Sequence, residues 1–302
     1  MTTMHERARP AHVRAGTRSL ANRTRTSPSI PGRLAREGKL HLLPLYALLR
    51  TSELAREGID NSGSYRFADH VYRGQAHGAL GVGTLLDALL LRLRAARSMR
   101  SRFFHARDEI LAVAHRHPAN RPFRVLSVPC GIARELVEVE ALLRAADPPL
   151  LARASFFGID LDPRPLELSR RLAREAPGFR FLRADALDPT AYPDELDVIV
   201  STGLGEFLPD DALVRFYGIC RDALRVGGSL VTSGTRRDPV SDYLMRELAE
   251  LRARYREPDE LLRLLRLAGF TDVSARMDAV GLQTLVIARR SPHEPPLTGG
   301  LR

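Results

Sequence analysis

Three residues that could bind a small molecule stand at the ends of apolar, β-branched runs in the sequence. They are Gly131 in the turn after the run 123–128, Asp160 in the run 156–162, and Asp185 in the run 180–187. A glycine lets a ligand approach the backbone N–H groups of a turn. A carboxylate at a strand end can accept hydrogen bonds from the two hydroxyl groups of a ribose. The spacing therefore predicts a ligand site at the ends of successive strands.

The elements that must position these residues alternate between strands and helices. Five apolar runs, separated by helix-forming segments, are predicted to be strands of one parallel sheet: 123–128, 156–162, 180–187, 196–203 and 224–233. Further along, 241–256 and 258–267 are predicted to be helices, with Ser241 as the cap of the first and Gly269 ending the second. The runs 273–277 and 282–288, separated by a four-residue turn, are predicted to form a final hairpin.

The motifs in this order resemble the class I S-adenosylmethionine-dependent methyltransferase family over roughly residues 100–290. The similarity includes the segment 264–273, of the kind that leads into that family's sixth strand. The resemblance implies an α/β fold: a doubly wound, Rossmann-like, seven-stranded and mostly parallel sheet with an antiparallel last strand. An α-helical N-terminal extension precedes the sheet here. The resemblance also implies S-adenosylmethionine as the cofactor.

Each strand end has a role in the resembling family. Residues 128–133 would form the loop under the methionine part of the cofactor, and residues 201–203 would flank the channel for methyl transfer. Asp160 would hold the ribose, and Asp185 would meet the adenine amino group, a role that the nearby Asp188 could also take. The cofactor-binding residues implied in this way are Val128, Pro129, Cys130, Gly131, Ala133, Asp160, Leu161, Asp185, Ala186, Ser201 and Thr202.

The first loop departs from the family's Asp-x-Gly-x-Gly-x-Gly pattern. This chain reads Ser-Val-Pro-Cys-Gly-Ile-Ala over 127–133, so one glycine remains and Ser127 replaces the acid. One expected contact to the amino group of the cofactor is therefore missing. Cys130 is expected to be a small wall residue, because the nucleophilic cysteine of cytosine-C5 methyltransferases follows the fourth strand instead.

Methyl transfer from a sulfonium depends on in-line geometry and exclusion of water more than on acids and bases. The segment 201–210, after the fourth predicted strand, lacks both the Asn/Asp-Pro-Pro-Tyr/Phe box and the Pro-Cys pair of nucleic-acid methyltransferases. It contains Glu206, which is either the catalytic candidate that orients the acceptor or an ordinary loop acid. Tyr65, His70 and Tyr72 are either lid residues over the site or packing residues.

The composition is that of a globular protein with a sizeable core, since 44% of the 302 residues are hydrophobic. Cys130 and Cys220 are too few for a disulfide framework or a metal cluster of their own, so no metal and a cytoplasmic location are expected. The net charge of +10 comes mainly from arginine, which fits either a codon bias or an anionic partner such as RNA.

Four segments are predicted along the chain. Residues 1–38 read as a disordered basic tail, 39–118 as a helical cap or lid, 119–290 as the methyltransferase domain, and 291–302 as a loose tail. The apolar segment 84–93 is too short to span a membrane.

Three functions follow from these observations. The leading one is a methyltransferase that acts on a small or medium-sized molecule, with residues 39–118 covering the substrate. The alternatives are an RNA methyltransferase, for which nucleic acid would be the partner, and a non-catalytic regulatory protein that binds S-adenosylmethionine. A nicotinamide-dependent dehydrogenase is disfavoured because the first turn lacks Gly-x-Gly-x-x-Gly.

Overall fold

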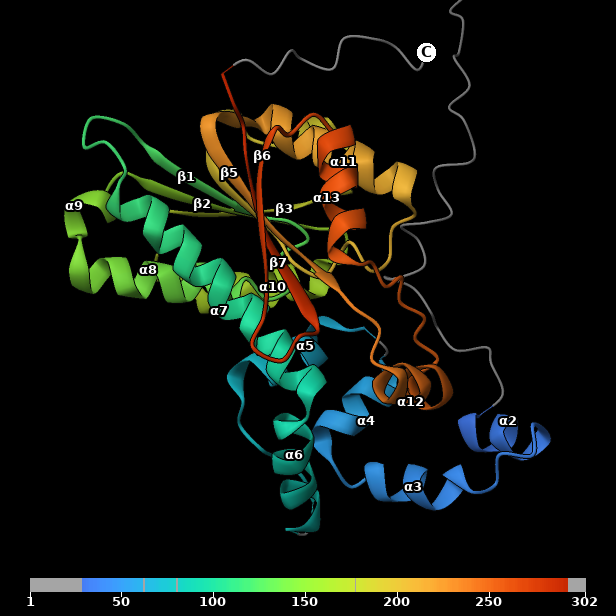
Figure 1. Cartoon of the computed structure of the whole chain (residues 1–302). Helices are drawn as coiled ribbons and strands as arrows, with labels where there is room; N and C mark the ends of the chain where they lie inside the picture. Colours follow the sequence, from blue (N-terminus) through green and yellow to red (C-terminus); the bar gives the residue numbers. More distant parts are fainter. Residues whose placement is uncertain (1–28, 62, 80, 177, 293–302) are drawn as a thin grey trace, which may run out of the picture.

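One sheet forms the centre of the computed structural model, which describes residues 29–61, 63–79, 81–176 and 178–292. Within these residues the sheet has seven strands in the order β3-β2-β1-β4-β5-β7-β6 (Figure 1). Their bounds are β1 (Phe123–Ser127), β2 (Ala154–Asp160), β3 (Phe179–Arg183), β4 (Leu196–Ser201), β5 (Leu224–Thr235), β6 (Asp272–Met277) and β7 (Gln283–Arg289). The strands β1 to β5 pair in parallel, and β7 is antiparallel to both of its neighbours. The predicted fold class is confirmed.

The strand order creates a binding crevice between β1 and β4. The chain adds β2 and β3 on one side of β1 and then crosses over to add β4 and β5 on the other side. Ser127 at the end of β1 is in register with Val200 of β4. In open α/β sheets, ligands bind beyond the carboxyl ends of the strands at such a reversal.

Helices cover both faces of the sheet because each helix has an apolar stripe that packs against the strands. Ile110, Val139 and Leu166 lie in the core of one face, and Phe216 and Leu265 lie in the core of the other. The first face is covered by α7 (Arg94–His115), α8 (Arg134–Ala146), the short α9 (Pro148–Leu151) and α10 (Pro163–Leu172). The second face is covered by α11 (Asp210–Ala223) and α13 (Pro258–Leu267). A 3-10 turn spans Pro189–Ala191. Within the described ranges, no helix combines the length and the apolar composition needed to cross a membrane.

A further group of helices lies beyond the carboxyl ends of the strands (Figure 1). We call it the cover; it consists of α2 (Ile30–Arg36), α3 (Leu42–Leu49), α4 (Glu53–Asp60), α5 (Tyr65–Arg73), α6 (Val82–Arg92) and α12 (Pro239–Ala249). Ile30 and Leu34 of α2 and Ile59 of α4 share one buried cluster with Leu248 of α12. The cover is therefore assembled from two distant parts of the chain. The sequence predicts a cap over 39–118, but the first part of the cover spans 30–92, and α7 packs on the sheet instead.

The carboxylate of Asp87 in α6 connects separate parts of the cover. Asp87 is fully buried and accepts hydrogen bonds from the Ser52 hydroxyl and from the backbone N–H groups of Leu54 (3.3 Å) and His77 (3.0 Å). The Nε2 atom of His70 lies 3.3 Å from the same carboxylate. One buried acid thus links α4, α5, α6 and the loops between them.

The beginning of the cover differs from the sequence prediction. The segment 1–38 reads as a disordered tail, but its last part forms α2, capped by the Ser29 hydroxyl. Ile30 and Leu34 are buried against the cluster shared with α12, and this burial offsets the entropy of ordering the helix. Residues 1–28 and 293–302 lie outside the described residues, so the predicted tails are untested there.

The helix predicted over 241–256 also has different bounds. It begins at Pro239 because Asp238 rather than Ser241 caps it, with the carboxylate accepting from the Ser241 N–H at 3.0 Å. It ends at Ala249 because Glu250 takes a left-handed conformation, with φ at 52°. The second helix and the final hairpin are confirmed at α13, β6 and β7.

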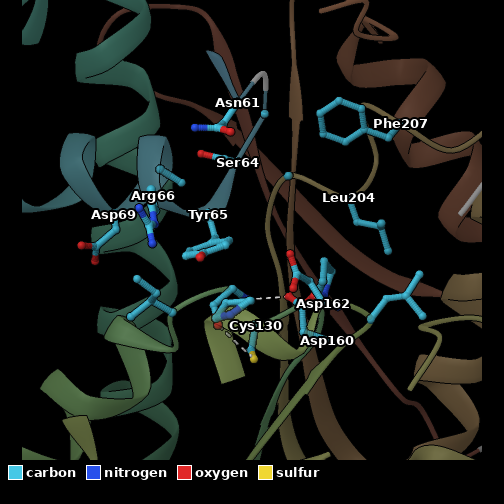
Figure 2. A pocket seen from close by; sticks show the side chains of 18 of the residues that line it. Asn61, Ser64, Tyr65, Arg66, Asp69, Cys130, Asp160, Asp162, Leu204 and Phe207 are labelled. Carbon is cyan, nitrogen blue, oxygen red and sulfur yellow. Dashed lines mark hydrogen bonds between the residues drawn. The ribbon is translucent and has the colours of Figure 1, made fainter. Parts of the chain in front are cut away.

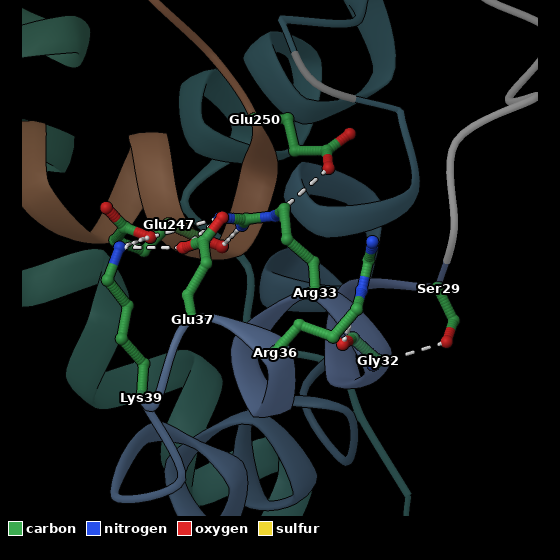
Figure 3. A network of polar contacts seen from close by, with 8 residues as sticks. All are labelled: Ser29, Gly32, Arg33, Arg36, Glu37, Lys39, Glu247 and Glu250. Atoms are coloured by element: carbon green, nitrogen blue, oxygen red, sulfur yellow. Dashed lines mark hydrogen bonds and ion pairs between the residues drawn. The ribbon is translucent and has the colours of Figure 1, made fainter.

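Ion pairs fasten α2 and the residues after it to α12 (Figure 3). Arg33 lies 3.2 Å from Glu247 and 3.4 Å from Glu250, and Lys39 lies 2.8 Å from both Glu247 and Glu37. The hydrogen bond from Lys39 lowers the pKa of Glu247; burial opposes this shift and Arg33 adds to it.

We expect Glu247→Gln to lower the free energy of unfolding by about 0.3–1 kcal/mol, since these ion pairs are partly exposed to solvent. Because the pKa of Glu247 is lowered in the folded state, its contribution is present above the pKa of the unfolded chain and is lost as the pH falls through the folded value. Urea denaturation at neutral and acidic pH measures both effects. The control Glu175→Gln changes an exposed acid and should have no effect; an equal loss in both variants would contradict the prediction.

We expect a sharp difference between two truncations. Removing residues 1–36 instead of 1–28 should cost about 3–6 kcal/mol more of cover stability, because it deletes the buried Ile30 and Leu34. Thermal denaturation of the two shortened chains measures the difference. Equal melting temperatures would show that α2 adds nothing to the fold.

Candidate functional site

A cavity of about 1050 Å³ lies between the cover and the carboxyl ends of the strands (Figure 2). Its floor comes from the loops after β1, β2, β3 and β4, including Gly131, Asp160, Asp185 and Gly203. Its roof comes from α4, from α5 with Tyr65, and from the segment after α12 with Leu251. The cavity is therefore at the strand reversal where the sequence places the ligand site.

The loop after β1 brings its backbone close to the cavity. Gly131 has a φ of 50°, and a Cβ atom built there would lie 3.5 Å from the Cβ of Tyr65 on the cover. The neighbouring Cys130 lines the cavity but is almost fully buried. Burial, with a smaller contribution from Asp160, raises the pKa of its thiol well above the usual range. Cys130 is thus a buried residue of the cavity wall, the position that the sequence predicts.

Asp160 at the end of β2 points into the cavity and also fixes the first loop (Figure 2). One carboxylate oxygen accepts the N–H of Gly131 at 2.9 Å, and the other accepts the N–H of Asp162 at 2.9 Å. Burial raises the pKa of Asp160, and these two hydrogen bonds oppose the shift. A carboxylate has about four acceptor positions, so these two contacts leave acceptor capacity for a ligand. Asp162, rather than Asp160, caps the next helix by accepting the N–H of Arg164.

The two acids after β3 have different positions. Asp185 lines the cavity and accepts the N–H of Leu187 at 2.9 Å. Asp188 is not part of the cavity wall, and its carboxylate caps the 3-10 turn by accepting from the N–H and hydroxyl of Thr190. The geometry favours Asp185 as the ligand contact.

The other predicted cofactor residues divide into two groups. Pro129, Leu161, Ala186 and Thr202 line the cavity together with the residues described above. Val128, Ala133 and Ser201 are buried and lie behind the wall. These three support the loops instead of facing a ligand.

Glu206 does not have the position that its predicted contact with an acceptor requires. It is buried behind the cavity wall, accepts a hydrogen bond from the Thr235 hydroxyl at 2.5 Å, and lies 3.6 Å from Arg102. Arg102 does line the cavity, and its Nε donates to the Tyr72 hydroxyl at 3.1 Å. Glu206 therefore lies beside a residue of the cavity wall rather than in the wall itself.

The three lid candidates are also separated by the structure. Tyr65 and Tyr72 of α5 line the cavity, whereas the ring of His70 turns towards Asp87 and bonds the carbonyl of Gln75 at 2.9 Å. The spacing of seven residues between the two tyrosines is two helical turns, so both are on one face of α5.

Many charged residues of the wall are missing from the sequence prediction, among them Arg102 of α7 and Glu135 of α8. Each of these two stands within a helix among many other charged residues, so composition and spacing do not distinguish them. Glu135 has one detectable signal, since it is in the first helical turn after the glycine loop. Within the described part of the chain, no group of three His, Cys, Asp or Glu side chains could hold a metal ion.

Comparisons with known sequences give one family and one curated relative. A family model described as "Putative methyltransferase" matches residues 48–290, a range that includes α4 to α6 of the cover and every strand of the sheet. The "Uncharacterized protein YnbC" of Escherichia coli (strain K12) is 26% identical over 245 residues, which are 77% of this chain and 40% of that protein. This chain thus spans less than half of that relative's length.

Solved structures share the fold. A "possible exported protein" from Bordetella parapertussis has 27% sequence identity and a TM-score of 0.68, over 83% of this chain and 87% of that chain. A magnesium protoporphyrin IX methyltransferase from Synechocystis PCC 6803, solved with bound S-adenosylhomocysteine, has 12% identity and a TM-score of 0.52, over 77% of this chain and 97% of that chain. The second similarity concerns the fold alone.

Proposed function

This chain belongs to the methyltransferase family whose model matches residues 48–290, and from that premise we propose that it transfers a methyl group from S-adenosylmethionine to a small or medium-sized molecule. One observation carries the proposal: the strand-end residues and the residues of the cover line the same cavity. A site roofed by helices admits a molecule of limited size more readily than a polymer.

The residues of the cavity fit the cofactor. Asp160 has acceptor positions available for the ribose hydroxyls, Asp185 can accept from the adenine amino group, and Gly131 permits close approach of the chain to the methionine part. The volume of about 1050 Å³ is at the top of the range of roughly 300–1,000 Å³ for single-ligand pockets, so space remains for an acceptor. When bound, the cofactor would supply an electrophilic methyl group on a sulfonium.

The acceptor would occupy the space between the loop after β4 and the cover. Leu204 and Phe207 form one wall of this space, and Figure 2 shows them opposite Tyr65 and Ser64. Leu251 extends the apolar surface from the segment after α12. These side chains would exclude water and hold an apolar or aromatic part of the acceptor, and the in-line geometry would follow from that orientation.

Transfer of a labelled methyl group tests the proposal. The purified protein is incubated with methyl-labelled S-adenosylmethionine and a cell extract, which is then separated into RNA, protein and small-molecule fractions. We expect label in the small-molecule fraction that depends on the protein. Label confined to nuclease-sensitive polymer would favour RNA methylation, and cofactor binding without any transfer would favour a regulatory protein.

A further inference from the structure

Glu135 is a buried acid without a cationic partner in the described structure. It is in the first turn of α8, lines the cavity, and accepts a hydrogen bond from the Ser127 hydroxyl at 2.5 Å. None of the ion pairs of the described residues includes it. Burial raises its pKa, although the Ser127 hydroxyl opposes the shift. A buried carboxylate without a cationic partner raises the free energy of the unliganded protein. Such a group suits a site where a ligand brings the positive charge.

Arg102 is the complementary cation. It is nine-tenths buried on α7, and of its five N–H donors one bonds the Tyr72 hydroxyl. Glu206 lies 3.6 Å from Nη1, which is beyond hydrogen-bond distance. The guanidinium lies against the backbone after β4, since a Cβ atom at Gly203 would be 3.1 Å from Nη2. Most of its donors thus stay available to a molecule in the cavity.

These opposite charges flank the crevice between β1 and β4. Glu135 is hydrogen-bonded to Ser127, the last residue of β1. Ser127 pairs with Val200 of β4. Arg102 lies against Gly203, three residues after Val200. Both side chains therefore line the same cavity next to the paired ends of these two strands. The methionine end of S-adenosylmethionine carries an ammonium and a carboxylate on one carbon atom.

We propose that Glu135 and Arg102 hold this zwitterionic end of the cofactor, with the Glu135 carboxylate accepting from the ammonium and the Arg102 guanidinium donating to the carboxylate. The inference rests on the proposed function. It also explains how the chain tolerates Ser127 at the position of the family's acid, because Ser127 orients a carboxylate supplied from the next helix. Tyr72 and Glu206 act as positioning residues for Arg102.

Two ligands that differ only in this part provide the test. S-adenosylhomocysteine has the amino-acid end, whereas 5′-methylthioadenosine has the same adenosine and thioether without it. Isothermal titration of each ligand gives an affinity ratio for every variant. We expect Arg102→Met and Glu135→Gln each to weaken S-adenosylhomocysteine by about tenfold or more and 5′-methylthioadenosine by less than about twofold.

Matched controls separate this effect from a general change of charge. Arg66→Met removes another arginine from the cavity wall, and Glu57→Gln neutralises another acid there. Both should keep the affinity ratio of the unchanged protein. Arg102→Lys retains the charge and should keep part of the preference for S-adenosylhomocysteine. This variant also provides the test if Arg102→Met does not fold.

The outcomes are distinct. If the unchanged protein binds neither ligand, the proposed function fails. If it binds both and the variants keep the affinity ratio, or lose both ligands equally while remaining folded, the assignment of Glu135 and Arg102 is overturned. A selective loss in Arg66→Met with none in Arg102→Met would transfer the carboxylate contact to α5 and likewise overturn it.

Discussion

Replacing Asp160 with alanine is expected to weaken the binding of S-adenosylhomocysteine by about 10- to 150-fold, or about 1.5–3 kcal/mol. The carboxylate would bond the ribose and at the same time accepts the N–H groups of Gly131 and Asp162, each at 2.9 Å. Its removal deletes the ligand contact and frees the first loop. Asp160→Asn keeps one oxygen acceptor and should give an intermediate loss.

Asp188→Ala is the matched control for Asp160→Ala. It removes an acid of the same type from the end of a neighbouring strand, but one that caps the 3-10 turn and does not line the cavity. Calorimetric titration of the three variants should give an unchanged affinity for Asp188→Ala alone. An unchanged affinity in a folded Asp160→Ala protein would place the ribose elsewhere.

Among the single substitutions, Asp87→Ala should produce the largest loss of stability, about 3–5 kcal/mol in the cover. The change leaves the Ser52 hydroxyl and the N–H groups of Leu54 and His77 without their buried acceptor. The sheet and its two cores do not depend on this carboxylate. We therefore expect hydrogen exchange to accelerate over residues 52–93 while strands β1 to β5 keep their protection.

A control for Asp87→Ala is Asp108→Ala, which removes a largely exposed acid of α7 and should change stability by less than about 0.5 kcal/mol. Because Tyr65 and Tyr72 of the cover line the cavity, Asp87→Ala should also weaken S-adenosylhomocysteine binding. Two results would contradict the prediction that Asp87 stabilises the cover alone: an equal loss of exchange protection in the sheet, or no loss of protection in the cover.

The sequence predicted the sheet and its ligand edge because both depend on local patterns. Each apolar run ends where its strand ends to within a few residues. Asp160 is the last residue of β2, and Asp185 comes two residues after β3. Parallel topology then brings those strand ends to one edge without further information. The site roles themselves remain predictions that the binding experiments test.

The charges at the roof and rear of the cavity depend on tertiary contacts that no local pattern encodes. Arg102 comes from the middle of a 22-residue helix, and α12 joins the cover from a segment more than 100 residues later. Glu206 looked like a site residue because it follows β4, but its side chain turns away to Thr235 and Arg102. The short α2 was missed because few apolar residues, Ile30 and Leu34 among them, hold it in place.

Calorimetric titration of the full chain with S-adenosylhomocysteine, with NAD as the comparison ligand, tests directly whether the cavity binds the proposed cofactor. We expect saturable binding at one site with micromolar affinity, about −8 kcal/mol, and no saturable binding of NAD. Absence of S-adenosylhomocysteine binding by folded protein at millimolar ligand, or tighter binding of NAD, would contradict this expectation.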